Sequence, residues 1–528
     1  MMQFMRHSIL VLAALAALAP SKLAAQTLSA HPQSARCFLY RGKPTVLITA
    51  TEHYGAVMNR EFDYVAYLDV LARNHLNLSR TFCFYRELES SIPPLGYANT
   101  LAPRPGHEAL PWRRTGPGQA ADGGLKFDLN QWNPEYFARM KDFLRQAERR
   151  NIIVEVVFFC NPYNDRTWSW FPCHRENNIN QVGGGITDFR QFMEQHDHKI
   201  VDFQKNFVRK MVLELNAFDN IYFEICNETS TRMKPRDPAD RQAAWHFALA
   251  EVVRQAEMEL PKKHLVAVNA HQRILAYEEN GKEYVETGDT AYFDHPLMDI
   301  INYHYISRKV PGKGAAVLDS GPVETGNIWA FLRARRDWRK PIVFDENYSG
   351  VIRGAPAIWD RNRMEAWETI ISGGAGFDHL EWAFTPQDPT GSGKASLPDG
   401  RRLDGARFRS QLRALVDLWN ECGPDRMGPS YDLVASVPDN SAGFASSRND
   451  GKMHVIYVGD TRAEKAGFGG PIRGAVSLRL PKGAYTLRVL HSGADKWTAL
   501  GSRRAGEAVT RIELPEFRQD YAMVLAAN

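Results

Sequence analysis

Cysteine is scarce in this sequence. Six Cys occur in 528 residues, with no Cys-x-x-Cys pair and no zinc-finger spacing, which excludes a disulfide scaffold and a cysteine-based zinc module. Cys160 and Cys173 flank one predicted loop and are the candidate pair for a disulfide. Cys83 and Cys226 lie in apolar runs, where a packed thiol is expected.

An excess of either charge is also lacking. The 65 Lys and Arg against 61 Asp and Glu leave a formal net charge of +4, which over this length argues against a nucleic-acid partner. Gly and Pro are dispersed without a period, which excludes collagen and short-repeat solenoids. With 44% hydrophobic residues, the chain has the composition of a folded soluble protein of two or three domains.

Long hydrophobic runs are absent after the N-terminus. Residues 1–25 form the exception, with Arg6 and His7 before an apolar run too short to span a bilayer and small residues before Gln26. This pattern predicts a signal peptide, so we expect a protein that is exported to the periplasm or the medium and that has no membrane contact once mature. A retained N-terminal anchor is the alternative.

Eight short apolar runs follow, separated by segments of helical periodicity. Several runs are rich in Val and Ile without strict alternation, as expected for strands buried on both faces. The predicted strands are Val46–Ala50, Leu76–Phe84, Ile152–Phe159, Ile221–Cys226, Leu265–Asn269, Ile300–Tyr305, Ile342–Asp345 and Phe377–Phe384. The predicted helices include Phe62–Arg73, Pro134–Arg150, Val201–Leu215, Ala239–Glu259, Asn327–Trp338 and Asn362–Ser372.

Eight strand–helix units in a row predict a (β/α)₈ TIM barrel over residues 26–422. A doubly wound open sheet would carry a glycine-rich first turn, and none follows the first strand. After Gly423 the runs become short, β-like and punctuated by Gly, Pro and Asp. They predict a small antiparallel β-sandwich over residues 430–528, an accessory domain that either binds glycan or covers one flank of the barrel.

Two connections are much longer than usual. They run from Tyr85 to about Asn130 and from Asn161 to about Lys199, and both follow strands. Both therefore belong to the C-terminal face of the barrel, where such folds place their active sites, and we expect them to wall a substrate cleft. Aromatic rings stack on sugar faces, so one of Trp168 and Trp170 is a candidate platform.

Two carboxylates close apolar strands. The fourth strand ends in Asn227–Glu228, and the seventh ends in Asp345–Glu346. Strands four and seven lie across the mouth of a barrel, so these Glu side chains can face each other. A retaining glycosidase needs two carboxyl groups about 5 Å apart, one to protonate the leaving oxygen and one to attack the anomeric carbon. Each Glu alone can equally cap a helix or pair with an Arg.

This arrangement resembles the clan A retaining glycoside hydrolases, in particular the cellulase-like family five and its relatives. The resemblance covers the barrel, from about Lys43 to Asn420. It implies that Glu228 is the general acid/base and Glu346 the nucleophile. It also implies that Asn227 hydrogen-bonds the sugar 2-hydroxyl, a contact that strengthens in the transition state.

The resemblance extends to other strand ends. Arg80 matches an Arg that keeps the nucleophile ionised, because a neighbouring cation lowers a carboxyl pKa. His304 and Tyr305 match a His/Tyr pair whose hydroxyl contacts the nucleophile, and Trp382 matches the aromatic floor of the −1 sugar site. His53, after the first strand, is a weaker match.

The chain departs from this family pattern at two positions. Thr229 stands where family members commonly have Pro after Asn-Glu, and Asp345 places a second carboxylate beside Glu346. Because neighbouring strand residues alternate faces, Asp345 is expected to point toward the helix layer.

The predicted function is a secreted hydrolase of β-linked glycans that works by double displacement without metal or cofactor. Its partner is a polysaccharide or oligosaccharide, and the sequence leaves protein partners unknown. A non-catalytic glycan-binding protein on a degenerate barrel is one alternative. A metal-dependent barrel hydrolase is another, for which His304 and His53 are the only candidate ligands apart from carboxylates.

Overall fold

A computed structural model describes most of the chain after its N-terminal segment. The described residues are 27–88, 96–229, 240–269, 274–279, 282–287, 290–304, 306–309, 316–318, 324–347, 358–462, 469–491, 493–506 and 508–528. The predicted signal peptide and Tyr305 lie outside them. Within the described residues, no helix combines the length and apolar character needed to cross a membrane.

All eight predicted barrel strands are present in one parallel sheet. In sheet order they are β4 (Leu47–Thr51), β17 (Gly376–Leu380), β16 (Ile342–Glu346), β13 (Ile300–His304), β10 (Val266–Asn269), β9 (Ile221–Asn227), β8 (Ile153–Cys160) and β5 (Leu78–Phe82). The outer strands β4 and β5 meet where the Asn77 amide donates to Ile48 O at 3.2 Å and Thr49 Oγ1 donates to Leu78 O at 2.6 Å. The sheet is therefore a nearly closed TIM barrel, as predicted.

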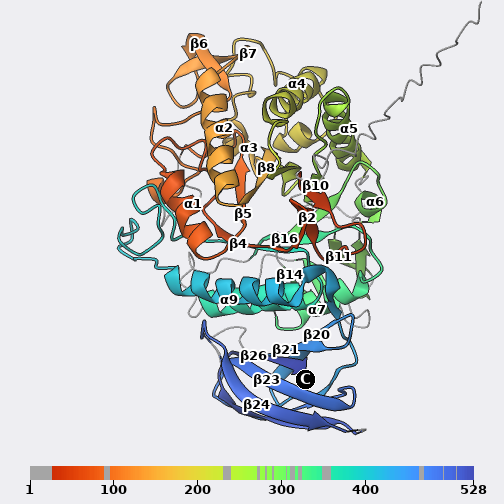
Figure 1. The fold of residues 1–528 in the computed structure, drawn as a ribbon. Coiled ribbons are helices and arrows are strands. Elements are labelled where there is room, and N and C mark those ends of the chain that lie inside the picture. The colour runs from red at the N-terminus through yellow and green to blue at the C-terminus, as the bar shows by residue number, and fades with distance from the viewer. Residues whose placement is uncertain are drawn as a thin grey trace, which may run out of the picture.

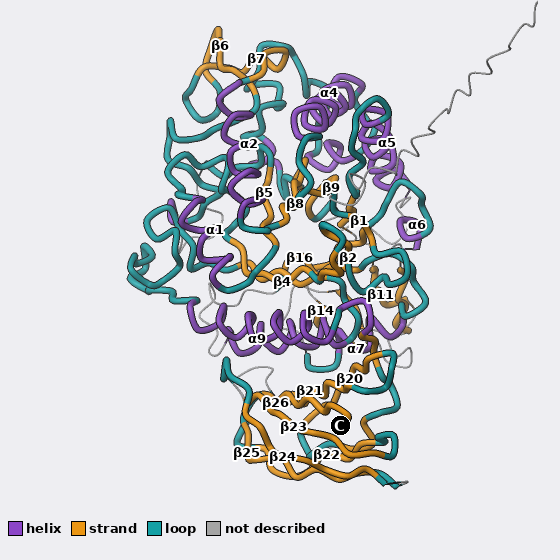
Figure 2. Tube along the Cα trace, viewed as in Figure 1, coloured by secondary structure: helices purple, strands orange, loops and turns teal. Residues whose placement is uncertain are grey.

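Helices surround this sheet (Figures 1 and 2). They are α1 (Tyr64–Arg73), α2 (Pro134–Arg149), α3 (Asp165–Trp168), α4 (His198–Leu215), α5 (Asp240–Glu257), α6 (Thr290–Phe293), α7 (Asn327–Ala334), α8 (Ile358–Ile371) and α9 (Ala406–Cys422). Side-chain caps fix the first residues of two of these helices. The Asn133 side chain accepts a hydrogen bond from Glu135 N in front of Pro134, and Asp63 caps α1 in the same way.

The barrel interior has an apolar floor. One residue from each strand region contributes, namely Leu47, Leu78, Ile153, Tyr222, Ala267, Ile300, Val343 and Ala375. Leu28, Phe38 and Tyr40 pack against this floor from the small sheet of β1 (Ser29–Ala30), β2 (Phe38–Tyr40) and β3 (Lys43–Thr45). Hydrophobic burial thus fills the end of the barrel opposite the strand termini that carry Glu228 and Glu346.

A polar layer lies above the floor. Residues two positions along a strand share its face, so the interior positions after the floor are polar in most strands. They are Thr49, Arg80, Glu155, Glu224, Asn269, Asn302 and Asp345, all nearly or fully buried. Burying so many polar groups is costly unless they bond to one another, so this layer prepares a site rather than a hydrophobic core.

The two long connections after β5 and β8 contain structure of their own. The first holds the hairpin β6 (Trp112–Gln119) and β7 (Leu125–Trp132), and the second holds α3. They pair with each other, since Phe127 N donates to Asn177 O at 2.8 Å and Ile179 N donates to Phe127 O at 3.0 Å. Both extend from the strand ends that carry the polar layer.

Antiparallel strands form the C-terminal part. A six-stranded sheet and a three-stranded sheet contain β18 (Met427–Pro429), β19 (Val434–Ser436), β20 (Ser441–Arg448), β21 (Met453–Asp460), β22 (Ile472–Leu478), β23 (Gly483–His491), β24 (Thr498–Ala505), β25 (Thr510–Phe517) and β26 (Asp520–Ala527). Two further pairs within residues 274–318 are β11 (Ile274–Glu279) with β12 (Lys282–Thr287), and β14 (Ile306–Lys309) with β15 (Ala316–Leu318).

The C-terminal sheets lie against α7, α8 and α9, on the outside of the barrel (Figure 1). Arg363 of α8 bonds both carboxylate oxygens of Asp520, at 2.9 and 2.7 Å, and the Tyr457 hydroxyl donates to the same carboxylate. The Trp367 and Tyr457 rings stack at 5.5 Å. A buried ion pair and aromatic packing therefore join the two parts.

The candidate pair Cys160 and Cys173 forms no disulfide, because all six cysteines are free and buried. The Cys160 thiol instead lies 3.5 Å from the Tyr163 hydroxyl and 3.4 Å from Asn227 Nδ2. It belongs to the packing around the polar layer.

Candidate active site

Glu228 follows the last residue of β9. Its backbone has φ 48°, a left-handed conformation that residues other than Gly rarely adopt. Asn161 stabilises this turn, because its backbone amide donates to Asn227 O at 3.1 Å and its side chain donates to Glu228 O at 2.7 Å. The bend turns the Glu228 side chain over the barrel mouth, where 13% of it remains exposed. Such strain in a non-glycine residue is typical of functional sites.

Glu346 is the last residue of β16 and is 8% exposed. Its Oε2 accepts a hydrogen bond from the Tyr54 hydroxyl at 3.1 Å and lies 3.7 Å from the Arg80 guanidinium. The Arg80 guanidinium lies over the Tyr54 ring, 4.6 Å from its centroid. A donor and a cation thus face the carboxylate, and both favour its ionised form.

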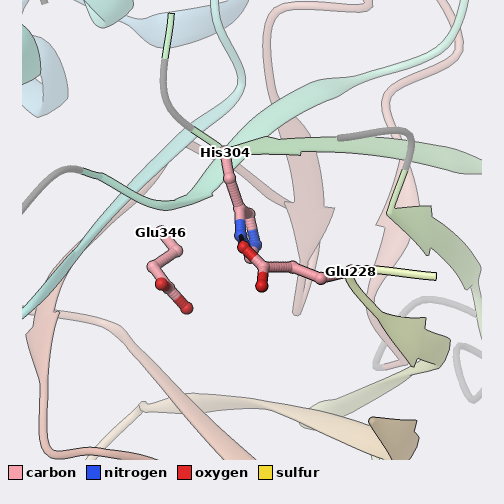
Figure 3. Close-up of side chains that lie close together, drawn as sticks. All are labelled: Glu228, His304 and Glu346. Atoms are coloured by element: carbon pink, nitrogen blue, oxygen red, sulfur yellow. Dashed lines mark hydrogen bonds and ion pairs between the residues drawn. The ribbon is translucent and has the colours of Figure 1, made fainter. Parts of the chain in front are cut away.

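The two carboxyl groups face each other. One oxygen of Glu228, one oxygen of Glu346 and one nitrogen of His304 all lie within 4.8 Å of one another. Figure 3 shows the Glu228 carboxylate against the His304 imidazole, with Glu346 on the other side of the same space. This separation fits the distance of about 5 Å between the two carboxyl groups of a retaining glycosidase.

Arg80 and Asn227 reach the site from below. Arg80 is fully buried, and one of its terminal nitrogens donates to Asn227 Oδ1 and to Glu224 Oε1, both at 2.9 Å. The Asn227 amide nitrogen donates to the Tyr163 hydroxyl at 2.9 Å. Arg80 therefore contacts the Glu346 carboxylate as expected, but most of its bonds go to the polar layer.

The expectation that Asp345 points toward the helices is wrong. Asp345 is fully buried inside the barrel, where its Oδ2 lies 3.2 Å from Arg80 and its Oδ1 lies 3.3 Å from His304 Nε2. Asp345 lies two positions after Val343 and therefore shares its inward face. A bulge that pairs His304 with Glu346, after Tyr303 has paired with Phe344, interrupts the alternation before Glu346. Both carboxylates of β16 consequently face the site.

His304 ends β13 and contacts Glu228 directly, with Nδ1 2.9 Å from Glu228 Oε1. Burial disfavours a charged imidazole, but the carboxylates of Asp345 and Glu346 outweigh burial and raise the pKa of His304 well above its ordinary value. The charged form of the ring is therefore favoured, with Nδ1 facing the Glu228 carboxylate and Nε2 3.3 Å from the Asp345 carboxylate.

His53 and Trp382 lie together beside this pair. The edge of one ring meets the face of the other at a centroid distance of 4.3 Å, and His53 Nδ1 bonds Asn99 Oδ1 at 2.6 Å. Burial lowers the pKa of His53 to about 3, so its imidazole is neutral. Trp382 follows β17 and is 5% exposed.

The two candidate tryptophans differ in their surroundings. Trp168 is buried, and its ring packs against Phe171 at 5.5 Å and Phe192 at 5.3 Å. Trp170 is half-buried under the Arg166 guanidinium, 5.6 Å from its ring centroid. Of the two, Trp170 retains more surface for a ligand.

Sequence reasoning missed two tyrosines of this site. Tyr54 makes the hydroxyl contact to Glu346 that was expected of Tyr305, which lies outside the described residues. Its only signal was its place directly after His53, at the end of the first strand. Tyr163 lies in a long insertion without a motif, and its contact to Asn227 spans 64 residues of sequence.

Two groups of side chains bring potential metal ligands together. They are Glu228, His304 and Glu346 at the rim, and the fully buried Glu155, Glu224 and Asp345 below. In the buried group, Arg80 approaches all three carboxylates at 2.9 to 3.4 Å and supplies the positive charge. In the rim group, a metal would need the neutral imidazole, whereas the surrounding carboxylates favour the charged one.

The fold is shared with glycoside hydrolases of known structure. One solved structure described as a glycoside hydrolase aligns with a TM-score of 0.60 at 13% identity, covering 96% of this chain and 98% of its own. A glycoside hydrolase family 5 structure from Bacteroides vulgatus aligns with a TM-score of 0.59 at 12% identity, covering 95% and 93%.

Sequence comparison is less informative. Residues 102–232, which include Glu228, match a family described as a domain of unknown function (DUF6298). No curated protein matches the chain. At 12–13% identity the structural likeness establishes the fold, and the chemistry must come from the site itself.

Proposed function

We propose that the chain is an exported retaining glycoside hydrolase that cleaves β-linked glycans by double displacement. The observation that carries the proposal is the pair Glu228 and Glu346, with carboxylate oxygens within 4.8 Å at the ends of β9 and β16. Export rests on the signal-like pattern of residues 1–25, and the expected partner is a polysaccharide or oligosaccharide.

In the first step a Glu346 carboxylate oxygen attacks the anomeric carbon while Glu228 donates its proton to the glycosidic oxygen. The carbon–oxygen bond to the leaving group breaks and a glycosyl ester forms on Glu346. In the second step Glu228 takes a proton from water, the resulting oxygen attacks the anomeric carbon, and Glu346 leaves as a carboxylate. Two inversions give net retention.

Two side chains stabilise the negative charge of the Glu346 carboxylate. Tyr54 donates to the Glu346 carboxylate at 3.1 Å, and Arg80 lies 3.7 Å from it. Trp382 and Trp170 are the proposed sugar-stacking rings, and Asn227 is the proposed partner of the sugar 2-hydroxyl. We also propose that residues 26–422 form the catalytic domain and residues 430–528 a sandwich, whose two sheets share one apolar cluster.

The test is product release from a panel of polysaccharides and aryl glycosides by wild type, Glu346→Gln and Glu228→Gln. Glu346→Gln should lose several orders of magnitude on every substrate. Glu228→Gln should still release a good aryl leaving group in the first step, because such a group needs no proton, and then stall.

Two controls separate the alternatives. Added azide should restore turnover to Glu228→Ala by replacing the water of the second step, but it should not do so by that route in Glu346→Gln. Chelator treatment should leave the wild type active, whereas loss of activity would support the alternative of a metal-dependent hydrolase. Glycan binding without turnover by the wild type would support the binding protein instead.

A further inference from the structure

The polar layer beneath the site contains titratable groups that the two-step mechanism does not use. Asp345 lies between the Arg80 guanidinium at 3.2 Å and His304 Nε2 at 3.3 Å, and all three side chains are fully buried. His304 in turn bonds Glu228 through its other nitrogen at 2.9 Å. A continuous line of contacts therefore joins a buried carboxylate to the proposed acid/base.

Two further carboxyl groups lie behind Asp345. Asn302 Nδ2 donates to Glu155 Oε1 at 2.6 Å and to Glu224 Oε2 at 2.7 Å, and thereby holds the two side by side. Burial and the neighbouring Glu224 raise the pKa of Glu155 well above its usual range, and burial raises the pKa of Glu224 to about 7.

The pKa of Asp345 shifts in the opposite direction to those of the two glutamates. Burial alone would raise its pKa, but Arg80 and His304 together lower it to about 2. The charged or titratable groups that face it are Arg80 from β5, Glu155 from β8, Glu224 from β9, His304 from β13 and Asp378 from β17. Burial thus favours the neutral form of the two glutamates, whereas Arg80 and His304 favour a negative charge on Asp345, which lies against the His304 ring.

We propose that Asp345 is a positioning residue that holds His304 as an imidazolium ion, with Nε2 facing Asp345 and Nδ1 aimed at Glu228. The proposal rests on the proposed function of Glu228. His304 Nδ1 and Glu228 Oε1 then share one proton across 2.9 Å. When Glu228 protonates the glycosidic oxygen, this proton comes from Nδ1, which leaves a neutral imidazole and a carboxylate, so the pair acts as one acid. Asp345 thereby sets the upper pH at which Glu228 can act as an acid.

The test is the pH dependence of kcat/KM for Asp345→Asn, which keeps the shape of the side chain and removes its charge. An adjacent carboxylate raises the pKa of a cation, so its removal lowers the pH at which the pair loses its proton. The alkaline limb should move to lower pH by about one unit or more. An unmoved limb would overturn the proposal.

Asp378→Asn is the matched control, because Asp378 is an equally buried barrel aspartate that bonds the Thr51 hydroxyl instead of His304. Burial raises the pKa of Asp378 well above its usual range and so favours its neutral form, which Asn resembles. Its alkaline limb should match the wild type. An equal shift in both variants would mean a general effect of the polar layer and would contradict a specific role of Asp345.

A second measurement needs neither activity nor the Asp345 variant. In wild-type protein with ¹⁵N-labelled histidine, the His304 ring should show the imidazolium signature at neutral pH, assigned by its absence in His304→Asn. A neutral His304 ring would overturn the proposal even if the enzyme hydrolyses glycans. An imidazolium ring in a protein that hydrolyses no glycan would support the Asp345 contact and refute the hydrolase.

Discussion

Tyr54 is the residue-scale feature that most directly links backbone and chemistry. Its φ of 56° places it in the left-handed region three residues after the end of β4, and this turn carries its hydroxyl to within 3.1 Å of Glu346 Oε2. A hydrogen bond to a charged group contributes about 1.5–3 kcal/mol. The contact is therefore large enough to appear in turnover.

Tyr54→Phe should lower kcat/KM by about tenfold to a hundredfold, because the attacking carboxylate loses its donor. The measurement is steady-state kinetics on the substrate that the panel identifies. Tyr67→Phe is the control, since that buried tyrosine pairs with Ser79 at 3.0 Å in the core. Equal kinetics for Tyr54→Phe and wild type would contradict the role given to the hydroxyl.

At this scale the sequence predicts the residues that end strands. Glu228, Glu346, Arg80 and His304 all meet because parallel strands bring their carboxyl ends to one rim. The inward direction of Asp345 was missed because its neighbour Glu346 also faces the site, and this breach of alternation depends on a bulge between β13 and β16 that no residue pattern reveals.

At the scale of elements, Asp197 joins a helix to a loop. Its carboxylate caps α4 through Lys199 N at 2.7 Å and Ile200 N at 3.3 Å, and also accepts from Gly185 N at 2.9 Å. It therefore fixes the end of the insertion that carries Tyr163 and Trp170.

Asp197→Ala should lower the free energy of unfolding by about 1–2 kcal/mol, because the helix loses its cap. Urea denaturation measures this change. Asp202→Ala, an exposed aspartate within the same helix, should change stability by no more than about 0.5 kcal/mol. Equal midpoints for the two variants would show that the cap contributes nothing.

Elements with strong periodicity were predictable and others were not. The eight barrel strands and six helices follow from apolar runs and from caps such as Asn133. Strand β6 of the hairpin has largely exposed residues and contains Gly116 and Pro117, so it lacks the apolar alternation that marks a half-buried strand, and only β7 shows it, at Leu125, Phe127 and Leu129. It forms because it pairs with the second insertion, a contact between segments distant in sequence.

At the scale of the whole molecule, a buried ion pair joins the barrel to the C-terminal sheets. Arg363 and Asp520 expose 3% and 5% of their side chains. Removing one partner of a buried pair leaves an uncompensated charge, which costs about 3–5 kcal/mol. The two parts should therefore unfold together rather than separately.

Asp520→Ala should lower the urea midpoint by an amount that corresponds to about 3 kcal/mol. Glu516→Ala is the matched control, because it breaks the exposed pair with Arg473 and should cost no more than about 1 kcal/mol. A separate early transition in the wild type would contradict the coupling of the two parts.

The stereochemistry of the first product tests the central claim most directly. Proton NMR should record the anomeric configuration of the sugar released from a β-linked substrate before mutarotation sets in. Attack by Glu346 with Glu228 as acid/base predicts that the β-anomer appears first. Initial release of the α-anomer would mean direct displacement by water and would contradict the proposed mechanism.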